Sequence, residues 1–266
     1  MSEPRLDPRR VQQALVAMLL DPAFAARVRG HEPVPELSER EQALLRDVDP
    51  RVLATDPHRR ARAVHVLVEE LPVTAAVLGL PAFEAFFGSP EFRAGLRRRA
   101  AMTSSFAAWL GDRALGIGRL EAAMAAVRRA EEPTGEGVRC APGVRGLVVP
   151  ANTLELYLRV RAELQPDPVH VLAHWGKRSR PSPPRRGTQC LLVERRTDGT
   201  LDLGTASAPL VRLLVFAELP RPRAAVEAEA VRLGAEPAEA AGLVDGLVTE
   251  GLLWAPAPIV EPPRLS

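Results

Sequence analysis

A turn at Asp198-Gly199 most constrains what this chain can fold into. It lies between two short runs of β-favouring residues, Gln189 to Arg195 and Thr200 to Leu203. Asp-Gly between such runs is a strong hairpin signal, because the tight turn that joins two antiparallel strands needs residues that accept a positive φ. A third run, Val169 to His174, supplies one more strand. We therefore expect a three-stranded sheet built from these three segments.

Three helices are expected after the hairpin. Ser207 is a capping residue, and residues 210–216 that follow it are apolar almost all the way round, which is typical of a buried helix. A second helix is expected over residues 223–233 and a third over residues 237–250, each ended by a glycine. Three strands followed by three helices predict a winged-helix-like module over residues 169–254.

The charge of the third expected helix bears on what this module binds. Residues 235–250, which include this helix, contain no basic residue and four acidic ones, Glu236, Glu239, Asp245 and Glu250. Winged-helix modules bind mostly nucleic acid or peptides, and a helix that enters the DNA major groove normally carries lysine or arginine. This charge favours peptide binding, or a scaffold role, over DNA recognition. A DNA-binding transcription regulator stays open as the alternative, with the basic loop Lys177 to Arg186 as its phosphate contact.

The chain of 266 residues is long enough for two domains. Residues 1–132 are expected to form a helical domain that docks on a partner. Residues 133–168 are expected to form a linker and a connecting helix, and residues 255–266 a proline-rich, flexible tail. The predicted fold class is therefore α+β and mostly α: an N-terminal helical domain followed by a C-terminal winged-helix-like module with a three-stranded sheet.

Capping residues mark where helices start in the N-terminal domain. A capping side chain precedes a proline at Asp7-Pro8, Asp21-Pro22, Asp56-Pro57 and Ser89-Pro90, and Ser38 with Glu41 forms a capping box. Helices are therefore predicted to begin near residues 8, 22, 39, 57 and 90. We expect the helix over residues 57–78 to be kinked at Pro72, and the aromatic residues between 83 and 109 to form a core.

Catalytic motifs are missing from the sequence. There is no phosphate-binding glycine loop, no His-Glu-x-x-His and no Gly-x-Ser-x-Gly. Cys140 and Cys190 are far apart, and His58 and His65 share a helix face without a third ligand in a matching pattern. We therefore expect a non-enzymatic chain with no metal site and no cofactor.

The chain carries no signals for membranes or export. It contains no apolar run near 18 residues and no signal-peptide pattern at its amino end. We expect a cytoplasmic protein with no membrane partner. A net charge of +2 is too small to name a polyanionic partner.

Two surfaces are candidates for binding. The first is a basic helix face on which Arg93 and Arg97 are expected to contact a protein partner, the alternative being a solvated face. The second is an exposed sheet edge that would bind an extended peptide, with the third helix as the opposite wall of a groove. Its candidate residues are Thr200, Leu201, Asp202, Leu203, Leu243, Asp245 and Leu247. The alternative for Leu243 and Leu247 is a place in the core.

Several segments occur in the order found in one known family. They are Arg59 or Arg60, Leu67 to Val73, Leu78-Gly79, Phe86-Phe87, Ser105 to Leu110, Arg119 to Glu121, Pro168 to Trp175, Leu191 to Val193 and Asp198-Gly199. In this order the chain resembles the family, named for a DNA-binding domain, whose members accompany multinuclear non-haem iron oxidases in clusters that make modified peptides. Two departures are that residues 63–65 carry no Tyr or Asn, and that Leu71 stands where the family has an aromatic residue.

The resemblance implies a non-catalytic accessory subunit for biosynthesis of ribosomal peptide natural products. Its helical domain would dock on a TIM-barrel iron oxidase to form a heterodimer. Its winged-helix-like module, similar to the peptide-recognition elements of such pathways, would bind a precursor peptide and present it to the oxidase. Nucleic acid is not an expected partner on this reading.

Overall fold

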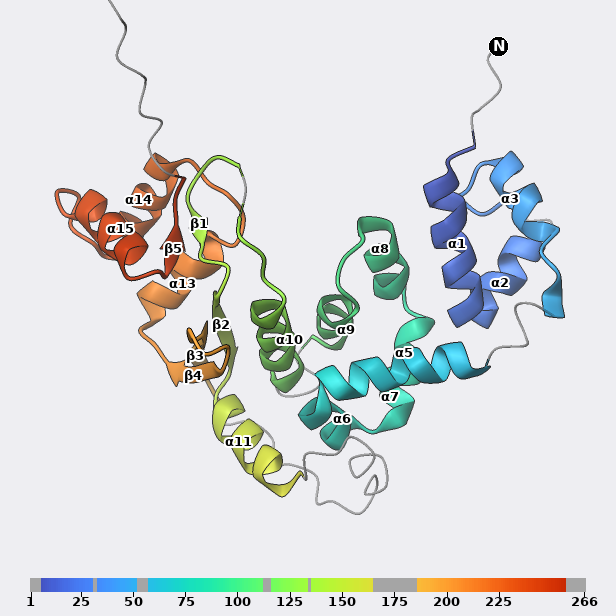
Figure 1. The fold of residues 1–266 in the computed structure, drawn as a ribbon, viewed down its shortest axis with the longest axis horizontal. Helices are drawn as coiled ribbons and strands as arrows, with labels where there is room; N and C mark the ends of the chain where they lie inside the picture. Colours follow the sequence, from blue (N-terminus) through green and yellow to red (C-terminus); the bar gives the residue numbers. More distant parts are fainter. Residues whose placement is uncertain are drawn as a thin grey trace, which may run out of the picture. The chain divides into compact units, whose positions relative to one another are not determined.

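The computed structural model describes residues 6–30, 33–51, 57–111, 116–133, 135–164 and 186–256. The described residues are mostly helical and include a small three-stranded antiparallel sheet, which confirms the mostly α, α+β class. The chain divides into two compact units (Figure 1). Unit 1 comprises residues 1–122 and 155–183, and unit 2 comprises residues 123–154 and 184–266.

Unit 1 is a helical unit whose helices begin where the capping residues predicted. The helices whose bounds fall in or reach into it are α1 (Pro8–Leu20), α2 (Pro22–Arg29), α3 (Glu39–Arg46), α5 (Pro57–Glu70), α6 (Pro72–Leu78), α7 (Leu80–Phe87), α8 (Pro90–Arg98), α9 (Met102–Leu110), α10 (Ile117–Arg128) and α11 (Thr153–Glu163). The side chains of Asp7, Asp21 and Ser89 each accept a hydrogen bond from a first-turn backbone N–H. Ser38 and Glu41 form the predicted capping box.

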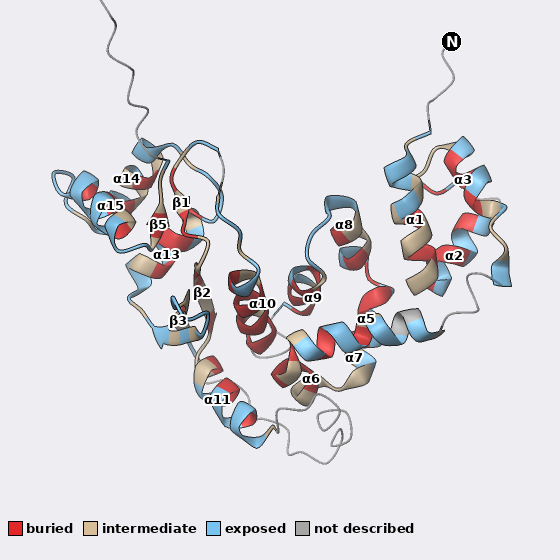
Figure 2. Cartoon of the chain, in the orientation of Figure 1, coloured by how far each residue is buried: buried red, intermediate tan, exposed pale blue. Residues whose placement is uncertain are grey.

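Two apolar cores stabilise unit 1. One lies among α1, α2 and α3 and includes Met18, Phe24 and Leu45. The other contains the predicted aromatic cluster, in which the rings of Phe83 and Phe106 are 4.5 Å apart. Leu96 of α8 packs against both cores. Figure 2 shows the resulting pattern, with buried residues on one side of each of the helices α1 to α3 and exposed residues on the other.

The expected kink at Pro72 is a complete break, so α5 and α6 are separate helices. Leu71, between them, offers no capping side chain to α6. Instead the carboxylate of Glu121, from α10, accepts hydrogen bonds from the backbone N–H groups of Val73 (2.9 Å) and Thr74 (2.8 Å). Glu121 is buried, and this burial raises the pKa of its carboxyl group to about 7, although the two N–H donors act in the opposite direction.

Unit 2 is built around the three-stranded sheet, whose strand order is β2-β3-β4. The strands are β2 (Val144–Pro150), β3 (Thr188–Arg195) and β4 (Leu201–Thr205). The hairpin of β3 and β4 around Asp198-Gly199 is as predicted, with Gly199 at φ 81°. The neighbour of β3 on its other side is β2, from the segment expected to be a linker, with Leu147 opposite Leu191 and Val148 opposite Cys190. Residues 169–174, the expected third strand, lie outside the described residues.

One face of the sheet is covered by α13 (Ala208–Phe216), which follows β4 directly. A Cβ added at Gly146 of β2 would come within 2.9 Å of the Val211 carbonyl oxygen, so a glycine permits the close approach of strand and helix. On the other face, the Arg195 guanidinium donates to the carbonyl oxygens of Arg128 (3.4 Å) and Ala130 (3.3 Å), at the end of α10.

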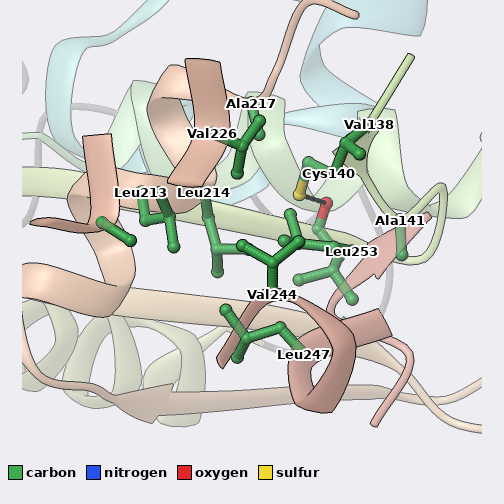
Figure 3. Close-up of a cluster of buried hydrophobic side chains, with 12 residues drawn as sticks. Val138, Cys140, Ala141, Leu213, Leu214, Ala217, Val226, Val244, Leu247 and Leu253 are labelled. Atoms are coloured by element: carbon green, nitrogen blue, oxygen red, sulfur yellow. Dashed lines mark hydrogen bonds between the residues drawn. The ribbon is translucent and has the colours of Figure 1, made fainter. Parts of the chain in front are cut away.

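The rest of unit 2 packs on α13. It consists of α14 (Arg223–Arg232), α15 (Ala240–Thr249) and a short ladder of β1 (Arg139–Cys140) with β5 (Leu253–Trp254). Figure 3 shows Val244 and Leu247 of α15 together with Leu214 of α13 and Leu253 of β5 in one apolar cluster. The observed unit therefore starts at residue 123, well before the expected module boundary at 169. The expected linker, residues 133–168, supplies β1 and β2 to unit 2 and also contains α11, most of which belongs to unit 1.

Candidate functional site

Strand β4 lies at an edge of the sheet, as the sequence predicted. It pairs with β3 on one side, and among the described residues no strand pairs with its other side. An edge strand presents backbone N–H and C=O groups to solvent, and these groups form hydrogen bonds with any extended chain that lies alongside. The candidate binding site therefore consists of the β4 residues whose backbone N–H and C=O groups point away from β3.

The register of the hairpin identifies the outward-facing residues. Arg196 N–H donates to the Thr200 carbonyl (2.8 Å), and Ala206 N–H donates to the Cys190 carbonyl (3.1 Å). Because inward and outward residues alternate in an antiparallel pair, Asp202 and Gly204 direct their backbone groups toward β3. Leu201, Leu203 and Thr205 direct theirs toward the open side.

Asp202 occupies part of this open edge with its own side chain. Its Oδ1 accepts a hydrogen bond from the Leu203 backbone N–H at 3.0 Å. Its Oδ2 accepts from the Arg196 guanidinium at 2.7 Å, and this hydrogen bond with Arg196 lowers the pKa of the Asp202 carboxyl. The central outward amide is thus already paired, and a peptide that bonds to it must displace the carboxylate.

Thr200 belongs to the turn and not to the edge. Its backbone N–H and its hydroxyl group both donate to Asp198 Oδ1, at 2.9 and 2.6 Å. Beyond the predicted range, Thr205 is the further outward residue, and Gly204 has open space around its Cβ position. Alternation along the hairpin was the signal that could have found Thr205 from the sequence, and the same signal places Arg196 on the same face as Asp202.

The three residues of α15 predicted to bind a peptide have different surroundings. Leu247 is 7% exposed and belongs to the apolar cluster, so it is a core residue and does not line a groove. Leu243 is 42% exposed. Asp245 is exposed but forms an ion pair with Arg223 of α14 at 2.8 Å, so its charge is already partly neutralised. In Figure 1, α13 lies between β4 and α15, so β4 and α15 are not the two walls of one groove.

Arg93 has an internal role, contrary to the expectation that its face has none. Its guanidinium forms an ion pair with Asp21 Oδ2 at 2.6 Å and donates to the Gly88 carbonyl at 3.2 Å. It also lies over the Phe24 ring, 5.9 Å from the ring centroid. Asp21 is buried and caps α2, so the Arg93 guanidinium neutralises a buried charge and is not free to contact a partner protein.

Arg97 differs from Arg93 although both lie on α8. The Arg97 side chain is exposed, and within the described part of the chain its guanidinium has no ion pair. Only its backbone carbonyl is engaged, by Gln13 Nε2 at 3.4 Å. The predicted partner surface therefore reduces to Arg97 and the exposed residues around it.

The described residues contain no ready site for a metal. Within them, no group of three or more His, Cys, Asp and Glu side chains could hold an ion. His65 pairs with Glu69 of the same helix at 3.1 Å. Burial raises the pKa of the Cys140 thiol to about 11, so this group is not a thiolate ligand at neutral pH. His170 and His174 lie outside the described residues.

Two further observations concern membrane helices and similarity to known proteins. No described helix is both long enough and apolar enough to cross a bilayer. No family model matches the chain, and no curated protein matches it.

Proposed function

We propose that this chain is a non-catalytic accessory subunit that binds a ribosomal precursor peptide as an added strand on β4. It then presents the peptide to a multinuclear non-haem iron oxidase, with which it forms a heterodimer. The observation that carries the proposal is the row of outward backbone groups on Leu201, Leu203 and Thr205, next to β3 on one side only. The winged-helix-like, recognition-element-like character of unit 2 is part of the same proposal.

The arrangement of unit 2 supports strand addition in two ways. The sheet is followed by three helices, α13, α14 and α15, in the order expected of a winged-helix peptide-recognition module. The hairpin also leaves open space at Gly204, so no side chain of β4 itself obstructs an approaching backbone there. A peptide in this position would gain several main-chain hydrogen bonds, which supply affinity in strand addition.

The charge of α15 supports a peptide over DNA. The one acidic residue of the helix, Asp245, is paired with Arg223, but the exposed Glu239 and Glu250 that flank the helix would repel phosphates if it entered a groove of DNA. The basic segment 177–185, which a DNA-binding regulator would use, lies outside the described residues. DNA binding by a transcription regulator is therefore kept as one possible outcome of the binding experiments described next.

Hydrogen exchange of the full chain tests the proposal directly. The chain is mixed with a candidate precursor peptide, and backbone exchange is followed with and without the peptide. We expect slower exchange at Leu201, Leu203 and Thr205, while Asp202 and Gly204, already bonded to β3, change little. The amides of Leu201 and Thr205 would gain a partner, and the amide of Leu203 would exchange the Asp202 carboxylate for a peptide carbonyl in a regular ladder. Protection spread evenly over β4, or none there, contradicts strand addition.

Salt dependence and copurification complete the test. Peptide binding through backbone groups should weaken far less with added salt than DNA binding, which releases counterions from many phosphates. A DNA fragment that binds more tightly than the peptide, with a steep loss on raising the salt, supports the regulator instead. Co-expression with a candidate multinuclear iron oxidase should yield a one-to-one complex if the heterodimer forms.

A further inference from the structure

A pocket in unit 1 lies away from the sheet and takes no part in the proposed strand addition. It opens between α1 and α8, beside residues 36 and 37, and has a volume of about 30 Å³. This is about twice what one water molecule needs, so the pocket admits the end of an aliphatic side chain but not an aromatic ring. The apolar part of its lining, here called the apolar floor, consists of Ala14, Ala17, Phe24, Leu37 and Leu96.

Arginines surround this apolar floor. Arg10, Arg93 and Arg97 line the pocket. Arg93 is held by Asp21, and Arg10 forms an ion pair with Glu41 at 3.3 Å. Arg97 is exposed and, in the described part of the chain, has no ion pair, so its guanidinium is available to a ligand.

Glu36 lies on the wall of the same pocket and limits where an acidic ligand can place its charge. Its Oε2 is buried and has no hydrogen-bond partner among the described residues. A ligand carboxylate placed against Glu36 would meet this negative charge, whereas one placed against the exposed Arg97 would meet a positive charge. An occupant is therefore favoured when its apolar part is inside and its acid is against Arg97.

We propose that this pocket docks a segment of a partner protein in which an aliphatic side chain lies next to a carboxylate. The aliphatic group fills the apolar floor, and the carboxylate pairs with Arg97. Arg98, which is exposed and also lies in the last turn of α8, adds positive charge nearby without lining the pocket. The site goes beyond the strand addition in the proposed function, because it requires neither β4 nor a precursor peptide.

The recognition is tested with the full chain and labelled model peptides, by fluorescence anisotropy. The probe carries one leucine, with two glutamates before it and two after it. We expect a dissociation constant below about 1 mM. Replacing the leucine with alanine should weaken binding about fivefold or more, and so should replacing the glutamates with glutamine. An alanine peptide that binds as well as the leucine peptide overturns the proposal, and so does a lack of binding at this concentration.

Matched variants of the chain show whether the pocket itself is used. Arg97→Glu should weaken binding of the leucine peptide about tenfold or more, while Arg98→Glu, with the same change of net charge, should weaken it less than about threefold. Glu36→Gln should strengthen binding, because it removes the negative charge from the wall. Thermal unfolding checks that each variant remains folded. If the two arginine variants lose the same amount of peptide affinity, the peptide is attracted by overall charge, and the proposal that it binds in the pocket is overturned.

Discussion

The carboxylate of Asp202 accepts a hydrogen bond from the backbone N–H of Leu203, its neighbour in the chain, at 3.0 Å. This N–H is the central one of the three that β4 directs away from the sheet. The other carboxylate oxygen is held by Arg196 across the hairpin. The edge of the sheet is therefore partly closed by a side chain, which protects it from unwanted strand pairing and sets a cost for any peptide that binds there.

Removing this side chain should open the edge. Asp202→Ala frees the Leu203 amide, so the affinity for the precursor peptide should rise about threefold, in line with the net value of about one hydrogen bond. Isothermal titration measures the change. The control is Arg196→Ala, which removes the ion pair but leaves Asp202 on the Leu203 amide and should give no rise. A loss of affinity in Asp202→Ala would mean that the carboxylate itself contacts the peptide.

Proline at two neighbouring positions of β4 should lower two different quantities, the affinity for the peptide at position 201 and the stability of the fold at position 202. Leu201→Pro removes an outward N–H, so it should lower peptide affinity about tenfold while the protein stays folded, since proline is tolerated at strand edges. Asp202→Pro removes an N–H that faces β3, so it should lower the free energy of unfolding instead. Chemical denaturation and peptide titration of both variants separate the two effects. If Leu201→Pro stays folded and binds the peptide normally, strand addition on β4 is wrong.

Arg93 is expected to matter for stability. Arg93→Ala leaves the Asp21 carboxylate buried without its partner, so the free energy of unfolding should fall by about 3 kcal/mol. Arg98→Ala, at an exposed position of the same helix, should change it by less than about 0.5 kcal/mol. Urea unfolding of the two variants checks this difference. Equal effects would mean that the ion pair between Arg93 and Asp21 contributes little.

Glu121 should make the stability of unit 1 depend on pH. Its folded pKa, raised from 4.5 to about 7, means that the folded state holds this proton more tightly than the unfolded state. The stabilisation is complete below about pH 4.5 and is lost as the pH rises through about 7, an effect on the order of 3 kcal/mol. Unfolding measured between pH 5 and 8 should show this loss.

The variant Glu121→Gln tests the assignment of that pH dependence. Glutamine has nearly the same size but no proton to lose, so the fall in stability between pH 5 and 8 should largely disappear. Glu91→Gln, at an exposed site, should keep the slope of the parent protein. If Glu121→Gln keeps that slope as well, another group is responsible.

The sequence alone determined the features that depend on neighbouring residues. Helix starts at Pro8, Pro22 and Pro90 follow from capping side chains that bond to amides two or three residues away. The hairpin at Asp198-Gly199 and the edge position of β4 follow from the turn and from the short connection to α13. Such interactions act within a few residues, so the local pattern contains the information needed to predict them.

Only the tertiary structure decided which distant segments meet. Strand β2, predicted to be part of a linker, pairs with β3, although helix α11 and a long segment separate the two strands along the chain. The amino end of α6 is capped by Glu121, and Arg93 is used by Asp21, in both cases by residues far away along the chain. Leu247 is buried while Leu243 of the same helix is exposed, because packing on α13 and β5 selects one side of α15. Periodicity identified both leucines as apolar, but the side that the core covers depends on how the helices pack together.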